Sequence, residues 1–267
     1  MCQDFAKAQC LRGASFAKRV TLSQRLGCHS VAVLAEGVRQ LTIGVLCIGA
    51  PAAGVNAGIR ALVKLAAYDG NAVSIFYEGV DGLLKGNSEV LTPKDVETWV
   101  MRGGCKIGSS RSTINKDNLP VVLEQVRSLD SLVVFGGFEA LVSVLALSDS
   151  SALPVYLIPA TISNNVPGTD FSIGCDTALN AIVGCTDAIK QSAASTRKRV
   201  FIVDVMGGYC GYLATLGAIA SGADSVYIPE QPVNIDQLQY DASRLINKMD
   251  HQGNTLTNVC LSVCTYP

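Results

Sequence analysis

The sequence is poor in the side chains that most catalytic and nucleic-acid-binding sites use. Of its 267 residues only two are histidines, His29 and His251, and one is a tryptophan. Its 21 lysines and arginines are balanced by 22 aspartates and glutamates, which leaves a formal net charge of -1. This balance argues against a nucleic-acid or membrane-surface partner, because both attract clustered positive charge. The histidines lie in segments without periodic pattern, where we expect them to be exposed to solvent.

Long apolar runs are also missing, although 49% of the residues are apolar. A membrane-spanning helix needs ~20 consecutive apolar residues, and no uncharged run approaches that length. The opening stretch "MCQDFAKAQCLRGASFAKRV" carries charges throughout, which argues against a secretory signal. Ten cysteines in such a chain indicate reduced thiols. Cys260 and Cys264 are the closest pair, but with so few histidines we expect no zinc site. We therefore expect a cytoplasmic protein.

What the sequence does contain is an alternation of strand and helix patterns from about residue 42 onward. The strand patterns are short and rich in Val, Ile, Leu and Phe, as strands buried on both faces of a parallel sheet are. They cover residues 41–48, 72–77, 132–135, 155–159, 200–205 and 225–228. The helical patterns cover 57–68, 138–147, 177–193, 209–221 and 235–249, with Asp176 and Asn234 as expected N-caps. The alternation predicts an α/β fold with a doubly wound, mostly parallel sheet and helices on both faces.

The two ends of the chain depart from this order. A strand pattern at 29–37 is followed at once by the one at 41–48, and the final "NVCLSVCTYP" predicts a strand with nothing after it. We therefore expect a fragment of a longer protein with three parts. Residues 1–40 would be a connector-like segment, 41–152 a first α/β unit, and 153–267 a second, incomplete unit.

Ligands of α/β folds bind at the carboxyl ends of strands, so the turns after the predicted strands are the candidate sites. The small-residue turn at 49–56 fits an anion at a helix N-terminus, or tight strand–helix packing. The glycine-rich loop at 103–111 carries Lys106 and Arg111 and fits a phosphate, or a solvated loop. The Gly-Gly turn at 136–140 is typical of packing, because Glu139 is its only potential metal ligand.

The turn after the strand at 155–159 is the strongest candidate. Thr161, Ser163, Asn164 and Asn165 place four hydrogen-bonding side chains within five residues, more than a helix cap needs. None of them is a carboxylate. Basic residues at 197–199 precede the next strand and are either solvated or reach a phosphate across a subunit boundary. With no Ser–His–Asp set, paired carboxylates or magnesium cluster, the turns together predict oxyanion binding without catalysis.

Six of these stretches occur in a familiar order. "GAPAAGVNAGIRALV", "FYEGVDGLLKG", "GGCKIGSSR", "VVFGGFEAL", "PATISNNVPGTDFSIGCDTALN" and "VFIVDVMGGYCGYLA" closely resemble the C-terminal half of a eukaryotic ATP-dependent 6-phosphofructokinase. The resemblance covers about residues 42–250, and "LRGASF" resembles the connector between the two halves of that enzyme. It implies a phosphofructokinase-like fold. In glycolysis, this family uses ATP and magnesium to phosphorylate the 1-hydroxyl of fructose 6-phosphate.

The resemblance also implies that this half does not catalyse. The family's catalytic turn reads Thr-Ile-Asp-Asn-Asp, whereas Ser163 and Asn165 stand here in place of its two carboxylates. The family's magnesium turn reads Gly-Gly-Asp-Gly-Ser, and Phe138 replaces its metal ligand. We therefore expect no catalytic residue and no metal site, and neither ATP nor magnesium bound for catalysis by this half. An active kinase is the alternative that these replacements oppose.

In the resemblance, such a half keeps its sugar-phosphate pocket as an effector site for fructose 2,6-bisphosphate. The residues that carry over are Arg111, Thr161, Ser163, Asn164, Asn165, Arg199, Met206, Gly207 and Gly208. The last three stand where the family has Met-Gly-Arg. The implied partners are an N-terminal catalytic half and further copies in a homotetramer. A truncated structural remnant without a ligand remains the second hypothesis.

Overall fold

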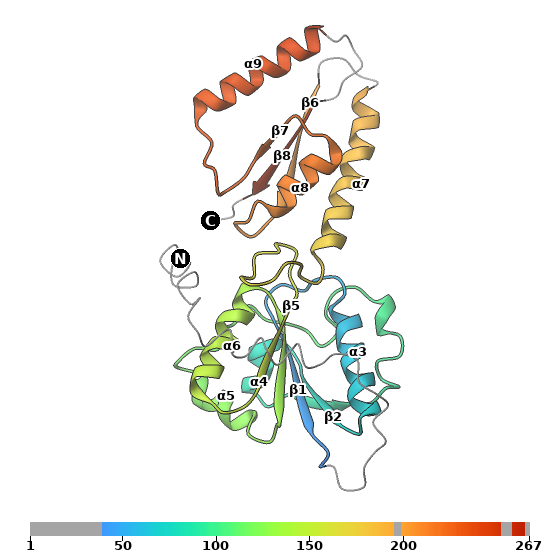
Figure 1. The fold of residues 1–267 in the computed structure, drawn as a ribbon, viewed down its shortest axis with the longest axis vertical. Helices are drawn as coiled ribbons and strands as arrows, with labels where there is room; N and C mark the ends of the chain where they lie inside the picture. Colours follow the sequence, from blue (N-terminus) through green and yellow to red (C-terminus); the bar gives the residue numbers. More distant parts are fainter. Residues whose placement is uncertain (1–38, 195–198, 252–257, 265–267) are drawn as a thin grey trace.

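The computed structural model describes residues 39–194, 199–251 and 258–264, which form two α/β units (Figure 1). The strands are β1 (Thr42–Ile48), β2 (Ala72–Phe76), β3 (Ser88–Leu91), β4 (Ser131–Gly136), β5 (Val155–Pro159), β6 (Val200–Met206), β7 (Ser225–Tyr227) and β8 (Asn258–Cys264). The helices are α3 (Val55–Tyr68), α4 (Gly79–Leu84), α5 (Leu119–Gln125), α6 (Phe138–Ser150), α7 (Cys175–Ala194), α8 (Tyr212–Ser221) and α9 (Ile235–His251), with a 3-10 turn η2 (Trp99–Met101).

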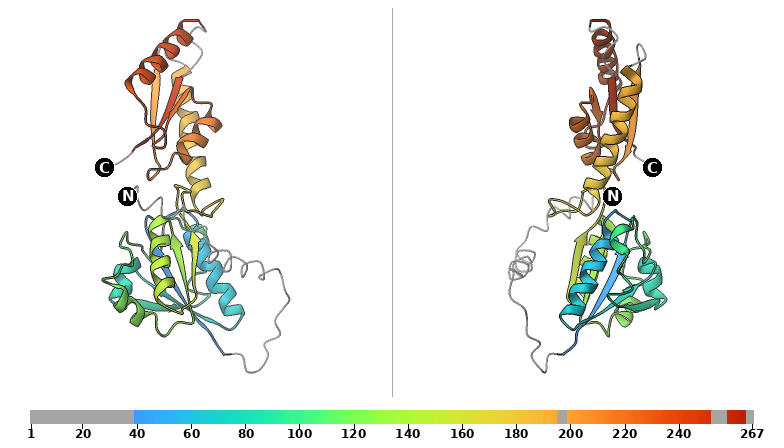
Figure 2. Two further views of the ribbon diagram at one scale, coloured as in Figure 1. Left: turned by 60° about the vertical axis from the view of Figure 1, so that its left-hand side comes forward. Right: turned by 90° about the vertical axis from the view of Figure 1, so that its right-hand side faces the viewer.

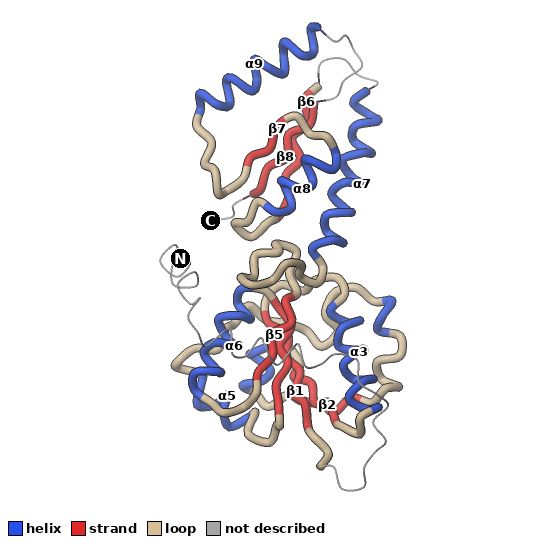
Figure 3. The backbone as a smooth tube through the Cα atoms, viewed as in Figure 1, coloured by secondary structure: helices blue, strands red, loops and turns tan. Residues whose placement is uncertain are grey.

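The two sheets are separate (Figure 3). The first has the order β3-β2-β1-β4-β5 and is parallel except for β3, which pairs antiparallel with β2. The second has the order β6-β8-β7 and is parallel. The strand order of the first sheet reverses direction at β1, as in doubly wound folds. The prediction of a mostly parallel α/β fold is confirmed.

The core of the first unit lies on both faces of its sheet. On β1, Val45 and Cys47 pack in one buried cluster with α3, while Leu46 and Ile48 pack in a second cluster with α4, α5 and α6. Figure 2 shows α3 and α6 on opposite faces of the strands. Helix α3 forms because its buried residues Val55, Ile59, Val63 and Ala66 recur at helical spacing. The apolar run of β1 is thus explained by burial on both sides.

Several details differ from the sequence prediction. The strand β3 and the short helices α4 and α5 were not predicted. The strand at 155–159, which we assigned to the second unit, pairs with β4 in the first sheet. Asp176 lies inside the first turn of α7 rather than before it, so its N-cap prediction is wrong. Asn234 does cap α9, since its Oδ1 accepts a hydrogen bond of 2.8 Å from the backbone N–H of Gln237.

Some predictions fall outside the described residues. These are the connector-like segment and strand at 29–37, and the side chains of His29, His251, Cys260 and Cys264. Within the described ranges, no helix has the length and apolar character that crossing a membrane requires.

Candidate functional site

The turns that follow β5 and β6 meet at the junction of the two units (Figure 1). A Cβ atom placed on Gly208 would lie 2.9 Å from Ser163 Oγ, which is closer than side-chain packing normally allows. Ser163 is 8% exposed. Two predicted site residues from different sheets are therefore in direct contact, although 45 positions (208 − 163) separate them in the sequence.

The turn after β6 has an unusual backbone. Gly208 and Tyr209 both have positive φ angles, 55° and 62°, and the N–H of Cys210 donates a 3.0 Å hydrogen bond to Gly207 O. The left-handed conformation is disfavoured for residues with a Cβ. At position 208 both the backbone angle and the contact with Ser163 favour glycine. This backbone brings the Met206–Gly208 segment against the turn after β5.

The turn after β5 is organised mainly by Asn164. This residue has a φ of 49°, and its Oδ1 accepts hydrogen bonds from Ser172 N at 2.8 Å and Ser172 Oγ at 2.9 Å. Its Nδ2 donates to Asp170 O at 3.1 Å. Asn164 thus closes the loop from 164 to 172. Some of the polar side chains that predicted a ligand site therefore form hydrogen bonds within the loop itself. Thr161 Oγ1 accepts from Ser163 N at 3.3 Å, and Asn165 is half-buried.

The glycine-rich loop at 103–111 reaches the carboxyl end of β1. Gly49 N–H donates to Ser110 O at 2.8 Å, and Ser110 forms an isolated bridge with Ile48. The next residue, Arg111, is exposed. Asn56 anchors the other end of the loop, because its Nδ2 donates to Arg102 O at 2.9 Å and its Oδ1 accepts from Lys106 N at 2.7 Å. The loop therefore carries Arg111 to the sheet edge where ligands of such folds bind.

Arg199 is not brought to this edge within one chain. It precedes β6, whereas Met206–Gly208 follows it, so the two lie at opposite ends of the strand. At about 3.3 Å per residue, the seven residues of β6 separate them by roughly 20 Å. The side chain of Arg199 is exposed. Within one chain, Arg199 therefore lies at the far end of β6 from the turn that contains Gly208.

Comparisons with known proteins agree with one family. A family model described as phosphofructokinase matches residues 42–262. The muscle-type ATP-dependent 6-phosphofructokinase of Mus musculus is 44% identical over 253 residues, which cover 92% of this chain and 32% of the mouse protein. The ATP-dependent 6-phosphofructokinase of Schistosoma mansoni is 43% identical over 259 residues, with coverages of 92% and 33%. The structure of phosphofructokinase from Saccharomyces cerevisiae has a TM-score of 0.80 at 37% identity, covering 84% of this chain and 31% of the yeast chain.

The chain belongs to the phosphofructokinase family. The predicted resemblance is confirmed at this level, and the chain spans about a third of the length of the curated phosphofructokinases it matches.

The turn between β4 and α6 does not fit the magnesium that the phosphofructokinase resemblance implied. Phe138, which the resemblance aligns with the family's metal-binding carboxylate, is an aromatic residue and offers no metal ligand. The carboxylate of Glu139 points back to the turn after β1, since its Oε2 lies 3.2 Å from the position that a Cβ of Gly49 would take. Among the described residues, no three His, Cys, Asp or Glu side chains gather as metal ligands would. The carboxylate of this turn therefore lies beside the small-residue turn after β1.

A second carboxylate, that of the exposed residue Glu230, lies at the N-terminus of α8. Glu230 Oε1 accepts a 2.8 Å hydrogen bond from Gly211 N–H, the capping residue of that helix. Burial, followed by the negative charge of Glu230, raises the pKa of the nearby Cys210 thiol. A carboxylate at a helix N-terminus stabilises the helix and competes with an external anion. The N-terminus of α8 is therefore already capped by a side chain of this chain.

Sequence reasoning did not assign three residues that shape the site. These are Asn56, Ser172 and Glu230. Asn56 is 1% exposed and Ser172 is 2% exposed, and both use their side chains to hold backbone of other segments. A polar residue inside an otherwise apolar stretch was the available signal for Asn56. Glu230 stands 19 positions after Gly211, and nothing in the local pattern joins the two.

Proposed function

We propose that this chain is a non-catalytic part of an ATP-dependent 6-phosphofructokinase and that it binds a fructose bisphosphate at the junction of its two units. The contact between Ser163 and Gly208 carries the proposal, because it joins the polar turn of one sheet to the glycine turn of the other. The resemblance places the chain in the C-terminal half of the enzyme. The whole enzyme would convert ATP and fructose 6-phosphate to ADP and fructose 1,6-bisphosphate in the cytoplasm.

The absence of phosphoryl transfer from this chain follows from the residues of the two turns. Phosphoryl transfer needs a positioned base, charge stabilisation and a metal. Ser163 and Asn165 supply no base, and losing one base alone typically costs ~10²–10⁴-fold in rate. Phe138 and the orientation of Glu139 remove the metal ligand as well. Turnover by this chain alone is therefore expected at background.

Binding of a sugar phosphate requires no such group. Hydroxyl and amide side chains at Thr161, Ser163 and Asn165 can hydrogen-bond sugar oxygens, and their neutrality avoids repelling phosphates. Arg111 adds one positive charge at the neighbouring sheet edge. Asn164 contributes by closing the loop, as its hydrogen bonds to Ser172 and Asp170 indicate. The effector that the resemblance suggests is fructose 2,6-bisphosphate.

The second phosphate would be held by Arg199 of a neighbouring subunit, because Arg199 lies at the far end of β6 from Met206–Gly208. The proposed assembly is a homotetramer of full-length chains, each with its own N-terminal catalytic half. A chain that binds no ligand and serves only as structural support is the competing hypothesis.

Thermal stabilisation tests the binding site on this chain. We expect fructose 2,6-bisphosphate to raise the melting temperature, because a ligand present at 100 times its Kd stabilises by about 2.7 kcal/mol. Arg111→Ala should weaken binding ~10- to 100-fold, the loss expected for a charge-assisted contact. Arg127→Ala is the matched control, because Arg127 precedes β4 and lies at the opposite edge of the sheet.

If the ligand raised the melting temperature of the Arg111 and Arg127 variants equally, Arg111 would not belong to the binding site. A chain that no fructose bisphosphate stabilises, either alone or in the full-length oligomer, would favour the structural role. Turnover that follows the purified chain in a coupled assay with ATP, magnesium and fructose 6-phosphate would contradict the non-catalytic assignment.

A further inference from the structure

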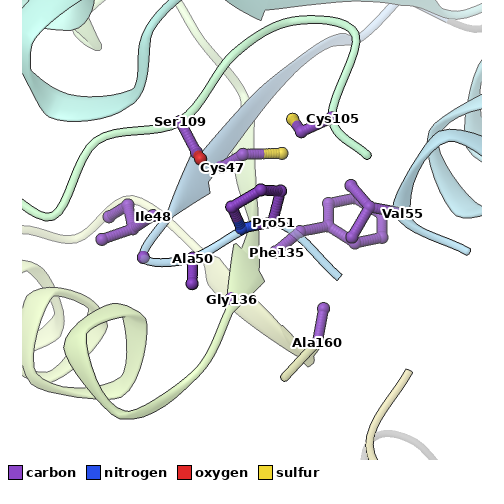
Figure 4. Close-up of a pocket in the computed structure, with 11 residues that line it drawn as sticks. Cys47, Ile48, Ala50, Pro51, Val55, Cys105, Ser109, Phe135, Gly136 and Ala160 are labelled. Carbon is purple, nitrogen blue, oxygen red and sulfur yellow. The ribbon is translucent and has the colours of Figure 1, made fainter. Parts of the chain in front are cut away.

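Two cysteine thiols face one another beneath the turn after β1. Cys47 lies on β1 and Cys105 on the loop at 103–111, and both line a small cavity of about 10 Å³ (Figure 4). Their sulfur atoms lie near each other at the wall of the cavity in that view. The cavity is about the size of one water molecule. Neither thiol belongs to the candidate site described above.

The loop that carries Cys105 is fixed on both sides of the residue. Before it, Asn56 Nδ2 donates hydrogen bonds to Arg102 O and Gly103 O at 2.9 and 3.1 Å. After it, Ile107 O accepts from Glu78 N at 2.8 Å. Cys105 itself closes a tight turn, since its O accepts from Gly108 N at 3.1 Å and its Sγ donates to Gly108 O at 3.2 Å. These hydrogen bonds therefore hold Cys105 in its position near Cys47.

The two thiols differ in exposure and acidity. Cys47 is 3% exposed, and its interaction with Cys105, together with burial, raises its pKa well above the ordinary value. Cys105 is half-buried on a surface loop. The hydrogen bond from Cys47 lowers the pKa of Cys105, and the backbone N–H groups of Ile107 and Gly108 add to this effect against the cost of burial. The more acidic thiol is thus the one that solvent reaches, as an attacking cysteine requires.

We propose that Cys47 and Cys105 form a reversible intramolecular disulfide by exchange with a small-molecule disulfide such as glutathione disulfide. The Cys105 thiolate attacks one sulfur of the oxidant, which releases one glutathione thiolate and leaves a mixed disulfide. Cys47 then loses its proton, attacks Cys105 Sγ and displaces the second glutathione. Two protein thiols are oxidised, one disulfide bond of glutathione is reduced to two thiols, and both protons pass to the departing thiolates.

The bond would tie the loop at 103–111 to β1. Without it, the loop reaches β1 through the hydrogen bond from Gly49 N to Ser110 O and the neighbouring Ile48–Ser110 bridge. A covalent link at Cys105 would restrict the whole loop in the unfolded chain as well as in the folded one. Oxidation is therefore expected to raise the melting temperature and to protect the bond after Arg102 from trypsin.

Peptide mapping tests the proposal on the full chain. After equilibration with glutathione disulfide, alkylation of remaining thiols, denaturation and digestion with trypsin, residues 40–60 and 103–106 should be recovered as one disulfide-linked peptide. Each of these peptides contains a single cysteine. Their joint mass should be about two daltons below the sum of the free peptides, for the two hydrogens lost. In the reduced protein, Cys105 should be alkylated about tenfold faster than Cys47.

Variants separate the attacking thiol from the resolving thiol. Cys47→Ala should leave Cys105 as a lasting mixed disulfide with glutathione, whereas the unchanged protein resolves it. Cys185→Ser, at an exposed thiol on α7, should leave the linked peptide unchanged. A stable glutathione adduct on Cys105 of the unchanged protein would overturn the proposal. The proposal would also be wrong if Cys47 and Cys105 remained reduced after equilibration. The same holds if either residue formed a disulfide preferentially with another cysteine. If Cys47→Ala does not fold, the linked peptide of the unchanged protein still decides.

Discussion

The two units use similar strands but cover them differently. In the first unit, four successive residues of β1 from Val45 to Ile48 are at most 3% exposed, because helices pack on both faces of the sheet. In the second unit, β6 is as apolar, with the sequence VFIVDVM, yet Ile202 is 74% exposed and Met206 is 67% exposed. An apolar strand sequence therefore indicates that the strand can be buried, but it does not show which elements cover the strand.

The same contrast appears in the cores. Among the residues whose side chains the structure describes, the buried cluster of the second unit contains Val205, Leu213, Ala214 and Ala218, with partly buried neighbours around them. Helix α9 adds a further face on which Ile235 is 71% exposed and Tyr240 is 65% exposed. Exposed apolar surface of this kind marks contacts with other protein. The first unit is consistent with an independently stable domain, whereas the second depends more on its surroundings.

The largest expected effect tests this contrast directly. Leu46→Ala on β1 should lower the free energy of unfolding by about 2–5 kcal/mol, since Leu46 is fully buried. Ile202→Ala on β6 should change it by less than about 0.5 kcal/mol, because the side chain is already exposed. Urea denaturation of both variants is the measurement. A large loss for Ile202→Ala would mean that other copies or segments cover β6 in solution.

The next largest effect concerns Arg199 at the start of the second unit and Ser163 in the turn after β5. In the full-length enzyme, Arg199→Ala should weaken activation by fructose 2,6-bisphosphate about 10- to 100-fold and leave basal turnover largely intact. Ser163→Asp should also weaken activation, because it returns a negative charge to the pocket. Activation curves at several effector concentrations measure both. If Arg199→Ala left the activation curve unchanged, the effector-site proposal would be wrong, whereas the fold assignment would not be affected.

A third prediction separates loop order from ligand binding in the first unit. Asn56→Ala removes the hydrogen bonds to Arg102 O, Gly103 O and Lys106 N, so it should cost about 1–3 kcal/mol. Trypsin should then cut faster after Arg102. Asn180→Ala on exposed α7 is the control and should change neither stability nor cleavage appreciably. Unchanged cleavage of the Asn56 variant would show that the loop is held by other contacts.

The smallest effect lies in the second unit. Asn234→Ala removes the cap of α9 and should cost about 0.5–2 kcal/mol. Asn234→Asp keeps a capping oxygen and should be nearly neutral. Urea denaturation compares the two variants. If both are neutral, α9 does not unfold together with the rest of the second unit.

Much of the fold follows from local pattern. The strand β5 has the bounds that its apolar run predicted, and β1, β4 and β6 differ from prediction by a few residues at most. Helix α4 was missed because its sequence GVDGLL contains two glycines, which lower helix propensity. It forms through tertiary burial, since Val80 and Leu83 are 0% exposed. The edge strand β3 was missed because Ser88, Glu89 and Val90 are exposed and give no apolar run.

The site was predictable in parts but not as a whole. The polar density at 161–165 predicted a ligand-binding turn, and the family resemblance assigned it to the same pocket as Met206–Gly208. The structure brings the two turns together, and the ligand stays a prediction. The hydrogen bonds of Asn164 could not be foreseen, because they depend on how the chain returns at Asp170 and Ser172. The pairing of Cys47 with Cys105 depends likewise on the path of a loop 58 positions away (105 − 47).

The contact of Ser163 with Gly208 bears on how such a half could change in evolution. The resemblance implies aspartate and arginine at these two positions in the family, whereas this chain has two small neutral residues beside one another. Aspartate at 163 alone would be bulkier and would lack its basic neighbour. Arginine at 208 alone would need a left-handed backbone and the space that Ser163 Oγ occupies. The side chain at position 163 therefore limits which residues position 208 can accommodate, and the left-handed backbone at 208 adds to that limit.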